Sequence, residues 1–363
     1  MKNTFGNSVS ITLFGESHGT AIGAVLDGMA PGIAVDEEFI AAQMTKRRSI
    51  SSLSTPRRED DKVKIVSGVV NGYTTGTPIT FLIENQDTKS CDYNQLSEIA
   101  RPGHADYTAY CKYHGFADTR GGGHFSGRIT AGLVAAGSVA LLALKNKGIE
   151  IATHIYACGG IYDRHFENLK EDFKALSSLD FAVLDSTQSE KMKDRIAKVK
   201  QEGDSVGGIL ETAVIGFPAG VGEPWFDSLE SVLSHAIFSV PAVKGVEFGD
   251  GFSLCDMQAS QANDPFCVLN DTIATETNHC GGILGGISNG MPLLFRTAIK
   301  PTPSIFKEQN TVNFKNNTDT VLSLSGRHDP AIVHRAAVVL DCVTALVLCD
   351  QLALRFGTDY FRS

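Results

Sequence analysis

Hydrophobic and polar residues alternate over residues 9–14, a pattern of period two that predicts a half-buried β-strand. Residues 21–28 are rich in apolar and β-branched side chains and are punctuated by glycine, so they predict a second strand that forms a hairpin with the first. Further strands are expected where β-branched runs lie between glycines or prolines, at residues 62–70, 78–84, 208–215 and 292–299.

Apolar residues at helical spacing, preceded by capping residues, predict helices elsewhere. Asp36 precedes a helix expected over residues 37–44, whose first turn is acidic and whose end carries the basic run 46–48, in agreement with the helix macrodipole. Three apolar residues form one stripe in the charged segment 187–202, which predicts a surface helix. Other helices are expected at residues 129–144, 227–238 and 331–356.

Two of these helices are apolar enough to be considered as membrane spans. Residues 129–144 lie between Arg128 and Lys145 and fall short of the roughly 20 residues that a bilayer requires. Residues 331–356 include Asp341 and Asp350, whose burial in lipid would be costly. We therefore expect two buried helices, in the core or at a subunit interface, and no membrane partner.

Helices and strands do not alternate regularly along the chain, which indicates an α+β fold. Gly68, Gly72 and Gly76 precede the strand expected at residues 78–84, and the same spacing recurs at Gly282, Gly286 and Gly290 before residues 292–299. This repeated glycine spacing predicts a duplicated unit, whose two halves are related by a pseudo-twofold axis. Because no low-complexity linker separates the halves, a single domain over residues 1–363 is expected.

Composition narrows the classes of partner. With 363 residues, of which 42% are hydrophobic, the chain can bury a large core. Its 32 basic residues are outnumbered by 41 acidic ones, and the net charge of −9 argues against nucleic acid, which requires broad positive potential. The 8 cysteines contain no C-x-x-C pair, so neither a metal centre nor a disulfide framework is expected. Residues 1–6 lack the apolar core of a secretion signal, and a cytoplasmic location is expected.

The first candidate site is the segment Gly15-Glu16-Ser17-His18-Gly19, which follows the N-terminal strand. Its spacing matches G-x-S-x-G, the turn that presents a nucleophilic serine in α/β-hydrolases. That turn is followed by a helix, whereas the residues after Gly19 predict a strand. The segment is better described as a glycine-framed turn that presents His18, a residue whose proton equilibrium lies near neutral pH.

Two later loops carry further candidates. A Pro-Gly pair places Arg101 and His104 in a turn, where His104 is a candidate acid and the alternative is a hydrogen-bonded structural histidine. Residues 120–128, Arg-Gly-Gly-Gly-His-Phe-Ser-Gly-Arg, lead directly into the helix expected at residues 129–144. Backbone N–H groups and arginines at a helix N-terminus suit anions, so this loop predicts a phosphate site; the alternative is a flexible surface loop.

Two segments near the C-terminus are also candidates. Residues 300–304, Lys-Pro-Thr-Pro-Ser, leave a strand in a proline-fixed extended conformation that can offer hydroxyl and backbone groups to a planar ligand. Arg327-His328-Asp329-Pro330 precedes the last helix. A structural interpretation of Asp329 competes with a catalytic one, because Asp at the N-cap and Pro at the first helical position commonly begin a helix.

Taken together and in order, these segments resemble the chorismate synthase family, over nearly the whole chain. No single segment is decisive, but the ordered set is specific. The matching segments are residues 15–19, parts of 43–59, 101–107, 120–123, 203–205, 242–247, 278–279, 281–288, 300–302 and 326–330.

The resemblance implies a β-α-β sandwich, a homotetramer and a lyase that converts 5-enolpyruvylshikimate 3-phosphate into chorismate by a 1,4-anti elimination of phosphate. It also implies reduced FMN as cofactor, although the reaction has no net redox change. Electron density would be donated as phosphate departs and recovered as the proton is taken up. The protein would supply binding, orientation and electrostatics, and reduced flavin is expected to come from an external reductant.

Carried over to this sequence, the family's catalytic positions are His18, His104 and Asp329. His18 would protonate or stabilise the departing phosphate, His104 would keep the reduced flavin in its required protonation state, and Asp329 would assist proton transfer near the flavin N5. The positions implied for the substrate's phosphate and carboxylates are Arg47, Arg48, Arg101, Arg128 and Arg327, with Arg47 also implied for NADP. Those implied for FMN are His124, Phe125, Ser126, Pro241, Ala242, Gly285, Lys300, Pro301, Thr302, Pro303, Ser304 and Arg327.

The chain departs from the family's pattern near several of these positions. After the triple glycine it has Phe125 and Ile129, where serine and glutamate are usual. Pro241 stands where asparagine is frequent, Pro303 where serine is frequent, and Leu53 where arginine is common. These differences are expected to change contacts with FMN and NADP.

Two other classes of function remain open from the residues alone. A serine hydrolase would use Ser17 as its nucleophile. A non-catalytic flavin- or nucleotide-binding protein would need Gly285 and residues 300–304 but neither His18 nor His104. The lyase is favoured because it accounts for all of these segments together.

Overall fold

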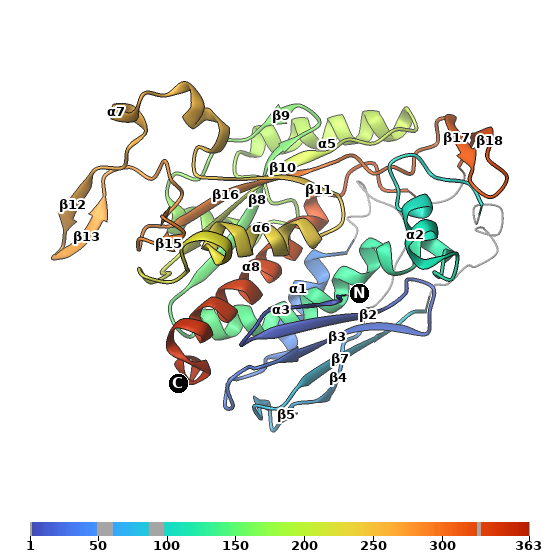
Figure 1. Ribbon diagram of the computed structural model, residues 1–363. Helices are drawn as coiled ribbons and strands as arrows, with labels where there is room; N and C mark the ends of the chain where they lie inside the picture. The colour runs from blue at the N-terminus through green and yellow to red at the C-terminus, as the bar shows by residue number, and fades with distance from the viewer. Residues whose placement is uncertain (1, 49–60, 87–97, 325–327, 363) are drawn as a thin grey trace.

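The computed structural model describes residues 2–48, 61–86, 98–324 and 328–362, and it contains two five-stranded antiparallel sheets with helices between them (Figure 1). The first sheet has the strand order β1-β2-β3-β7-β4 and the second β11-β16-β10-β8-β9. The strands of the first are β1 (Thr4–Phe5), β2 (Ser10–Gly15), β3 (Ala21–Asp27), β7 (Ile79–Glu84) and β4 (Lys64–Ser67). Those of the second are β11 (Val243–Phe248), β16 (Leu293–Ile299), β10 (Gly208–Ile215), β8 (Glu150–Cys158) and β9 (Ile161–Tyr162).

Two long apolar helices form the centre of the layer between the sheets. α3 (Thr130–Lys145) packs against the first sheet and α8 (Val333–Phe356) against the second, and the two helices pack against each other. A Cβ on Gly137 of α3 would lie 2.4 Å from the Cβ of Cys342 on α8, so glycine is needed for this close approach. α1 (Glu37–Lys46) and α6 (Leu229–Ser239) flank the pair. This arrangement confirms the predicted α+β sandwich.

The remaining elements are further helices, two-stranded hairpins and short 3₁₀ helices. Additional helices are α2 (Asp106–Tyr113), α4 (Leu169–Leu176), α5 (Ser186–Gln201) and α7 (Ala259–Ala262). Small hairpins are β5 (Val69–Val70) with β6 (Tyr73–Thr74), β12 (Phe266–Leu269) with β13 (Thr272–Thr275), β14 (Ile283–Leu284) with β15 (Ile287–Ser288), and β17 (Gln309–Asn313) with β18 (Thr318–Leu322). Short 3₁₀ helices are η2 (Arg120–Phe125), η3 (Gly127–Ile129), η4 (Trp225–Asp227), η5 (Gly251–Asp256) and η6 (Thr358–Phe361).

The local signals placed most of these elements correctly, and two helix starts were wrong. β2 and β3 form the predicted hairpin, and the Asp36 side chain caps α1 by accepting a hydrogen bond from the Phe39 N–H at 3.0 Å. α6 begins after Ser228, which caps it, rather than at Asp227. The last helix begins at Val333, so Asp329 is not its N-cap. The structural interpretation of Asp329 as a capping residue is therefore wrong.

The two halves of the molecule repeat the same hydrogen bonds. Thr74 Oγ1, in the β5–β6 hairpin, donates to the Ala30 carbonyl at 2.6 Å and accepts from the backbone N–H three residues after Ala30 at 2.9 Å. Ser288 Oγ, in the β14–β15 hairpin, donates to the Pro218 carbonyl at 2.6 Å and accepts from the N–H three residues after Pro218 at 3.0 Å. Each hairpin precedes a strand that lies next to the edge strand of its sheet, β7 or β16. This repetition supports the duplicated unit predicted from the glycine spacing.

Two segments are long and apolar enough to cross a membrane by length and composition alone, residues 127–145 and the helix α8. Within the molecule, 83% of the first window and 89% of the second is buried. Burial of this extent is what core helices of a sandwich require, because each packs against a sheet and against the other helix.

A buried polar network joins strands of the second sheet. His154 on β8 lies 3.2 Å from Asp163 and 3.0 Å from Glu211 on β10, and the half-exposed His165 lies 2.5 Å from the other oxygen of Glu211. Burial alone would raise the pKa of Glu211, but hydrogen bonds from the two histidines outweigh it and lower that pKa to about 2. The same carboxylates outweigh the effect of burial on His154 and raise its pKa.

This network predicts a pH dependence of stability. Because the pKa of Glu211 is lower in the folded chain than its ordinary value of 4.5, its stabilisation is complete above about pH 4.5 and is lost as the pH falls toward 2. The contribution of His154, whose pKa is raised from 6.5, is complete below that value and is lost as the pH rises through the raised pKa. We expect Glu211→Gln to lower the free energy of unfolding at pH 6 by on the order of 3 kcal/mol and to flatten its decline between pH 4.5 and 2. Urea unfolding at several pH values, with the exposed Glu190→Gln as control, measures this; equal acid slopes in wild type and Glu211→Gln would contradict it.

Candidate functional site

His18 lies in the turn between β2 and β3, buried against the triple-glycine loop of η2. A Cβ on Gly121 would lie 2.0 Å from Cε1 of His18, and the φ of +60° at Gly121 is also one that glycine adopts most readily. The Ser17 N–H donates to the Gly123 carbonyl at 3.1 Å, which fixes the turn to the loop. The three glycines therefore serve close backbone approach to an imidazole, in a loop that the sequence predicted only as an anion site.

Ser17 does not have the geometry of a hydrolase nucleophile. Its side chain is buried, and its hydroxyl donates to the Arg120 carbonyl at 3.2 Å. The turn continues into a strand, β3, and not into the helix that a nucleophile elbow requires. The hydroxyl also lies 3.1 Å from Nδ1 of His18. Ser17 is thus a partner that orients His18.

His104 approaches the same loop from the turn before α2. A Cβ on Gly122 would lie 3.4 Å from both Cε1 and Nε2 of His104. On the other side of the ring, Nδ1 lies 3.0 Å from Asp106 Oδ1. Because Gly121 contacts His18 and Gly122 contacts His104, neighbouring residues of one loop hold the two candidate catalytic histidines.

Asp106 organises this turn. Its carboxylate accepts hydrogen bonds from Arg101 Nε at 2.8 Å and Nη2 at 2.7 Å, in addition to its contact with His104. Burial alone would raise the pKa of Asp106, but the hydrogen bonds from Arg101 and His104 hold it well below its usual range. Nδ1 of His104 lies beside both Asp106 Oδ1 and, at 3.2 Å, Arg101 Nη2, and Nε2 is the ring nitrogen that faces Gly122.

A buried carboxylate, Asp61, joins two of the predicted substrate-binding arginines. Asp61 Oδ2 accepts from Arg47 Nη2 at 2.5 Å, and Oδ1 accepts from Arg128 Nη1. Burial opposes ionisation of Asp61, but the two guanidinium groups outweigh it and lower its pKa. Burial is also the main reason that the pKa of Arg47 is lowered to about 10, so Arg47 stays charged at neutral pH. Its Nε is buried and has no hydrogen-bond partner among the described residues.

Two further side chains connect this ion pair to the rest of the site. Asn85 accepts from Arg128 Nε at 3.1 Å and donates to the carbonyls of Glu16 and Gly19 at 2.9 Å, on either side of His18. Arg335 of α8 donates to the Arg47 carbonyl at 2.9 Å and to Asp329 at 2.5 Å.

The segment 300–304 completes the link to His104. The ammonium group of Lys300 donates to the Gly103 carbonyl at 2.5 Å, and a Cβ on Gly103 would lie 3.4 Å from Pro303. The Lys300 N–H donates to the carbonyl of Ala242, which has a φ of +76°. Ser304 and Asp329 border one small cavity. Pro241 adjoins Ala242, and the carbonyl of Thr302 accepts from Ser205 Oγ at 2.7 Å.

These contacts, together with the small cavity that Ser304 and Asp329 both border, form a closed circuit, which passes through residues that are far apart in the chain. Starting from the N-terminal turn, it runs through His18, Gly121, Gly122, His104, Gly103, Lys300, Pro303, Ser304, Asp329, Arg335, Arg47, Asp61, Arg128 and Asn85, and returns to Glu16 and Gly19. The predicted residues His18, His104, Asp329, Arg47, Arg128 and Lys300 therefore belong to one region, and Arg101 joins it through Asp106, which also contacts His104.

Other predicted residues lie beside this circuit or apart from it. His124 Nδ1 donates to the Gly15 carbonyl at 2.8 Å, Ser126 caps η3, and Phe125 is half-exposed against Tyr113. Gly285 lies in the β14–β15 turn, near the N-terminal end of β16, whereas Lys300 follows the C-terminal end of that strand (Figure 1). Within a single chain, Gly285 therefore lies away from the circuit. Arg48 is exposed after α1. Arg327 and Leu53 lie outside the described residues.

Sequence reasoning missed Asp61, Asn85 and Arg335. Asp61 ends an acidic run that follows two arginines, a composition typical of a solvated surface, and Asn85 follows a strand without any motif. Arg335 lies within the apolar segment 331–356 and belongs to no motif. A polar residue in an apolar helix is a signal for a buried partner, and here that signal points to Asp329.

Comparison with known proteins agrees with this geometry. A sequence model of the chorismate synthase family matches residues 9–353. Chorismate synthase of Dehalococcoides mccartyi is 47% identical over 358 residues, covering 98% of each chain, and that of Thermococcus gammatolerans is 46% identical, covering 96% of this chain and 97% of the relative. A crystal structure of chorismate synthase superposes with a TM-score of 0.75 at 27% identity, covering 97% of this chain and 94% of that one.

The fold and these relatives define an enzyme, a carbon–oxygen lyase that acts on a small molecule in aromatic amino acid biosynthesis. The chain belongs to the chorismate synthase family.

Proposed function

We propose that this chain forms one domain that eliminates phosphate from 5-enolpyruvylshikimate 3-phosphate in the 1,4-anti sense, giving chorismate, with reduced FMN as cofactor. The observation that carries the proposal is the closed circuit, which brings two histidines and three buried arginines to one region. Such a region suits a substrate that carries one phosphate and two carboxylates.

The arginines hold the anionic groups of the substrate. Arg47 and Arg128 share the carboxylate of Asp61, which holds the two buried guanidinium groups side by side. The buried Nε of Arg47 has no partner among the described residues and is a donor that an anion can use. Arg101, held in a bidentate pair by Asp106, adds a fixed positive charge beside His104. We assign Arg48 and Arg327 to the same task, and Arg47 also to NADP.

His18 protonates or stabilises the departing phosphate. A hydroxyl carries one proton, and that of Ser17 donates to the Arg120 carbonyl. Nδ1 of His18 lies 3.1 Å from the Ser17 oxygen, so we assign proton transfer to Nε2, the other ring nitrogen. Burial against the glycine loop fixes the ring in one orientation, and a fixed orientation is what a general acid requires.

The segment 300–304 and its neighbours fit a planar, phosphorylated cofactor. Thr302 Oγ1 is buried without a hydrogen-bond partner among the described residues, and burial lowers the pKa of Lys300 while its ammonium group stays near Gly103. We assign FMN to residues 124–126, 241–242 and 300–304, with Gly285 and Arg327. When bound, the reduced flavin supplies electron density that eases departure of phosphate from an allylic carbon. His104, oriented by Asp106, keeps the cofactor's protonation state, and Asp329, held by Arg335, assists proton removal.

Three further properties complete the proposal. We expect a homotetramer, a location in the cytosol, and reduced flavin that comes from a separate reductant. The apolar surface exposed at the β12–β13 hairpin, with Phe266, Val268 and Ile273 more than half exposed, supports association with other copies.

An anaerobic assay tests the reaction. With photoreduced FMN, the purified chain is expected to release one phosphate per molecule of 5-enolpyruvylshikimate 3-phosphate and to form chorismate, followed by its absorbance. Oxidised FMN with NADPH should give no turnover. The wild-type chain should hydrolyse no ester, so Ser17→Ala should have no effect in an ester-hydrolysis assay. Flavin binding without phosphate release would favour a non-catalytic flavoprotein and overturn the proposal.

A further inference from the structure

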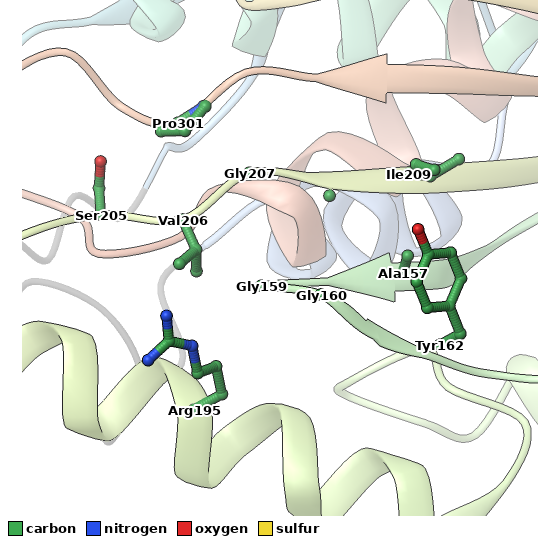
Figure 2. Close-up of a pocket in the computed structure, with 11 residues that line it drawn as sticks. Ala157, Gly159, Gly160, Tyr162, Arg195, Ser205, Val206, Gly207, Ile209 and Pro301 are labelled. Carbon is green, nitrogen blue, oxygen red and sulfur yellow. The ribbon is translucent and has the colours of Figure 1, made fainter.

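A second cavity, of about 370 Å³, lies between α5 and the second sheet (Figure 2). Glycine pairs form much of its wall, Gly159 and Gly160 after β8 and Gly207 and Gly208 where β10 begins. Its volume is in the range of small-molecule sites, and glycines allow a ligand to approach the backbone closely. Of the residues that line it, the function proposed above uses only Pro301, which belongs to the segment 300–304 assigned to FMN.

The cavity contains a single cationic side chain, Arg195 of α5. No hydrogen bond or ion pair joins Arg195 to any residue in the described part of the chain. A Cβ on Gly159 would lie 2.8 Å from Cγ of Arg195, so the side chain lies flat against the backbone there. Figure 2 shows its guanidinium group directed toward Val206 at the cavity wall. The nearby carboxylate of Asp204 is already paired with Lys307 at 2.7 Å. Arg195 is therefore a positioned cation with fork geometry for one carboxylate.

The rest of the lining suits a flat apolar body. Tyr162 of β9, 55% exposed, and the ring of Pro301 border the cavity from different elements (Figure 2). A Cβ on Gly160 would meet nothing within 4 Å, so the space beside the aromatic ring is open. An aromatic face and a proline ring stack on planar groups, whereas a phosphate dianion would call for a second cation.

This cavity is separate from the circuit of His18 and His104, although both touch the segment 300–304. Pro301 faces β10, because a Cβ on Gly207 would lie 3.0 Å from its Cδ. Lys300 and Pro303 instead face Gly103. The extended segment thus has the cavity on one side and the circuit on the other.

We propose that this cavity binds a small aromatic monocarboxylate, with the carboxylate on Arg195 and the ring against Tyr162 and Pro301. The proposal concerns binding alone and does not rest on the reaction assigned to the circuit, with which it shares only Pro301 of the segment assigned to FMN.

Benzoate is the probe that tests it, titrated into the full chain and followed by ligand-observed NMR. A ligand of so few atoms is expected to bind with a Kd on the order of 1 mM. Arg195→Gln should weaken binding at least about tenfold, and Arg195→Lys, which keeps the charge but not the fork, should weaken it less. Lys198→Gln removes the same charge from an exposed position on the same helix and should leave the Kd unchanged.

Three results would overturn the proposal. The first is equal loss of binding in Arg195→Gln and Lys198→Gln, which would show a general effect of charge. The second is displacement of benzoate by inorganic phosphate at similar concentration, which would identify a bare anion site. The third is displacement by 5-enolpyruvylshikimate 3-phosphate, which would place benzoate in the circuit. An unchanged circular dichroism spectrum of Arg195→Gln verifies that the variant is folded. Failure of phosphate release in the assay above would not change the interpretation of the benzoate titrations.

Discussion

Asp61→Asn is expected to lower the free energy of unfolding by about 3–5 kcal/mol and to raise KM for the substrate. Asp61 is buried between Arg47 and Arg128 and is the shared partner of both guanidinium groups. Asparagine has nearly the same shape but no charge, so both buried guanidinium groups would lose the carboxylate that they share. Urea unfolding measures the first effect, and initial rates at varied substrate concentration measure the second.

The matched control for this prediction is Glu190→Gln, which removes the same charge from an exposed ion pair with Lys193. That change should cost less than about 1 kcal/mol, because exposed pairs contribute little. If Asp61→Asn and Glu190→Gln unfold at the same urea concentration, Asp61 does not hold the arginines in the way described.

The fold was predictable from the sequence where a local pattern marks the element. The prediction failed where the partners of an element are distant in the chain. Residues 208–215 were predicted as a strand and form β10 with the same bounds, since glycine and β-branched residues mark it. β8 was not predicted because Thr153 and His154 interrupt its apolar pattern. Their polar groups are satisfied across the sheet, Thr153 by Thr212 at 2.8 Å and His154 by Glu211. A sequence pattern does not record such pairings.

The start of the last helix shows the same limit. Asp329 and Pro330 have the composition of a helix start, but tertiary contacts hold them outside the helix. The Pro330 carbonyl accepts from the Val206 N–H at 2.8 Å, and Asp329 is paired with Arg335 one turn into α8. A local capping preference is worth about 1 kcal/mol, and a buried ion pair and a backbone hydrogen bond together outweigh it.

The candidate site was predictable in part for a comparable reason. His18 and His104 stand in glycine- or proline-marked turns, which expose side chains and are visible in the sequence. Asp61 stands 67 positions from Arg128, and nothing near either residue indicates that they meet. The resemblance to a family supplied the arginines, but their shared carboxylate came only from the structure.

His18→Ala is expected to lower kcat by roughly 100-fold to 10,000-fold, the usual contribution of a positioned general acid. The substrate's anionic groups are held elsewhere, by Arg47, Arg101 and Arg128, so KM should change little. Phosphate release under saturating reduced FMN measures kcat. His235→Ala, an exposed histidine on α6, is the matched control and should retain full activity.

Gly121→Ala gives an independent test of the same imidazole without removing it. The added Cβ would lie 2.0 Å from Cε1 and 2.2 Å from Nδ1 of His18, so the ring must move away from its position beside Ser17. Alanine at a φ of +60° costs about 1–2 kcal/mol of stability in addition. Gly127→Ala makes the same chemical change in the same loop where a Cβ would meet nothing within 4 Å. We expect Gly121→Ala to approach the kcat of His18→Ala and Gly127→Ala to match wild type; a fully active, folded Gly121→Ala would show that the position of His18 does not matter to the reaction.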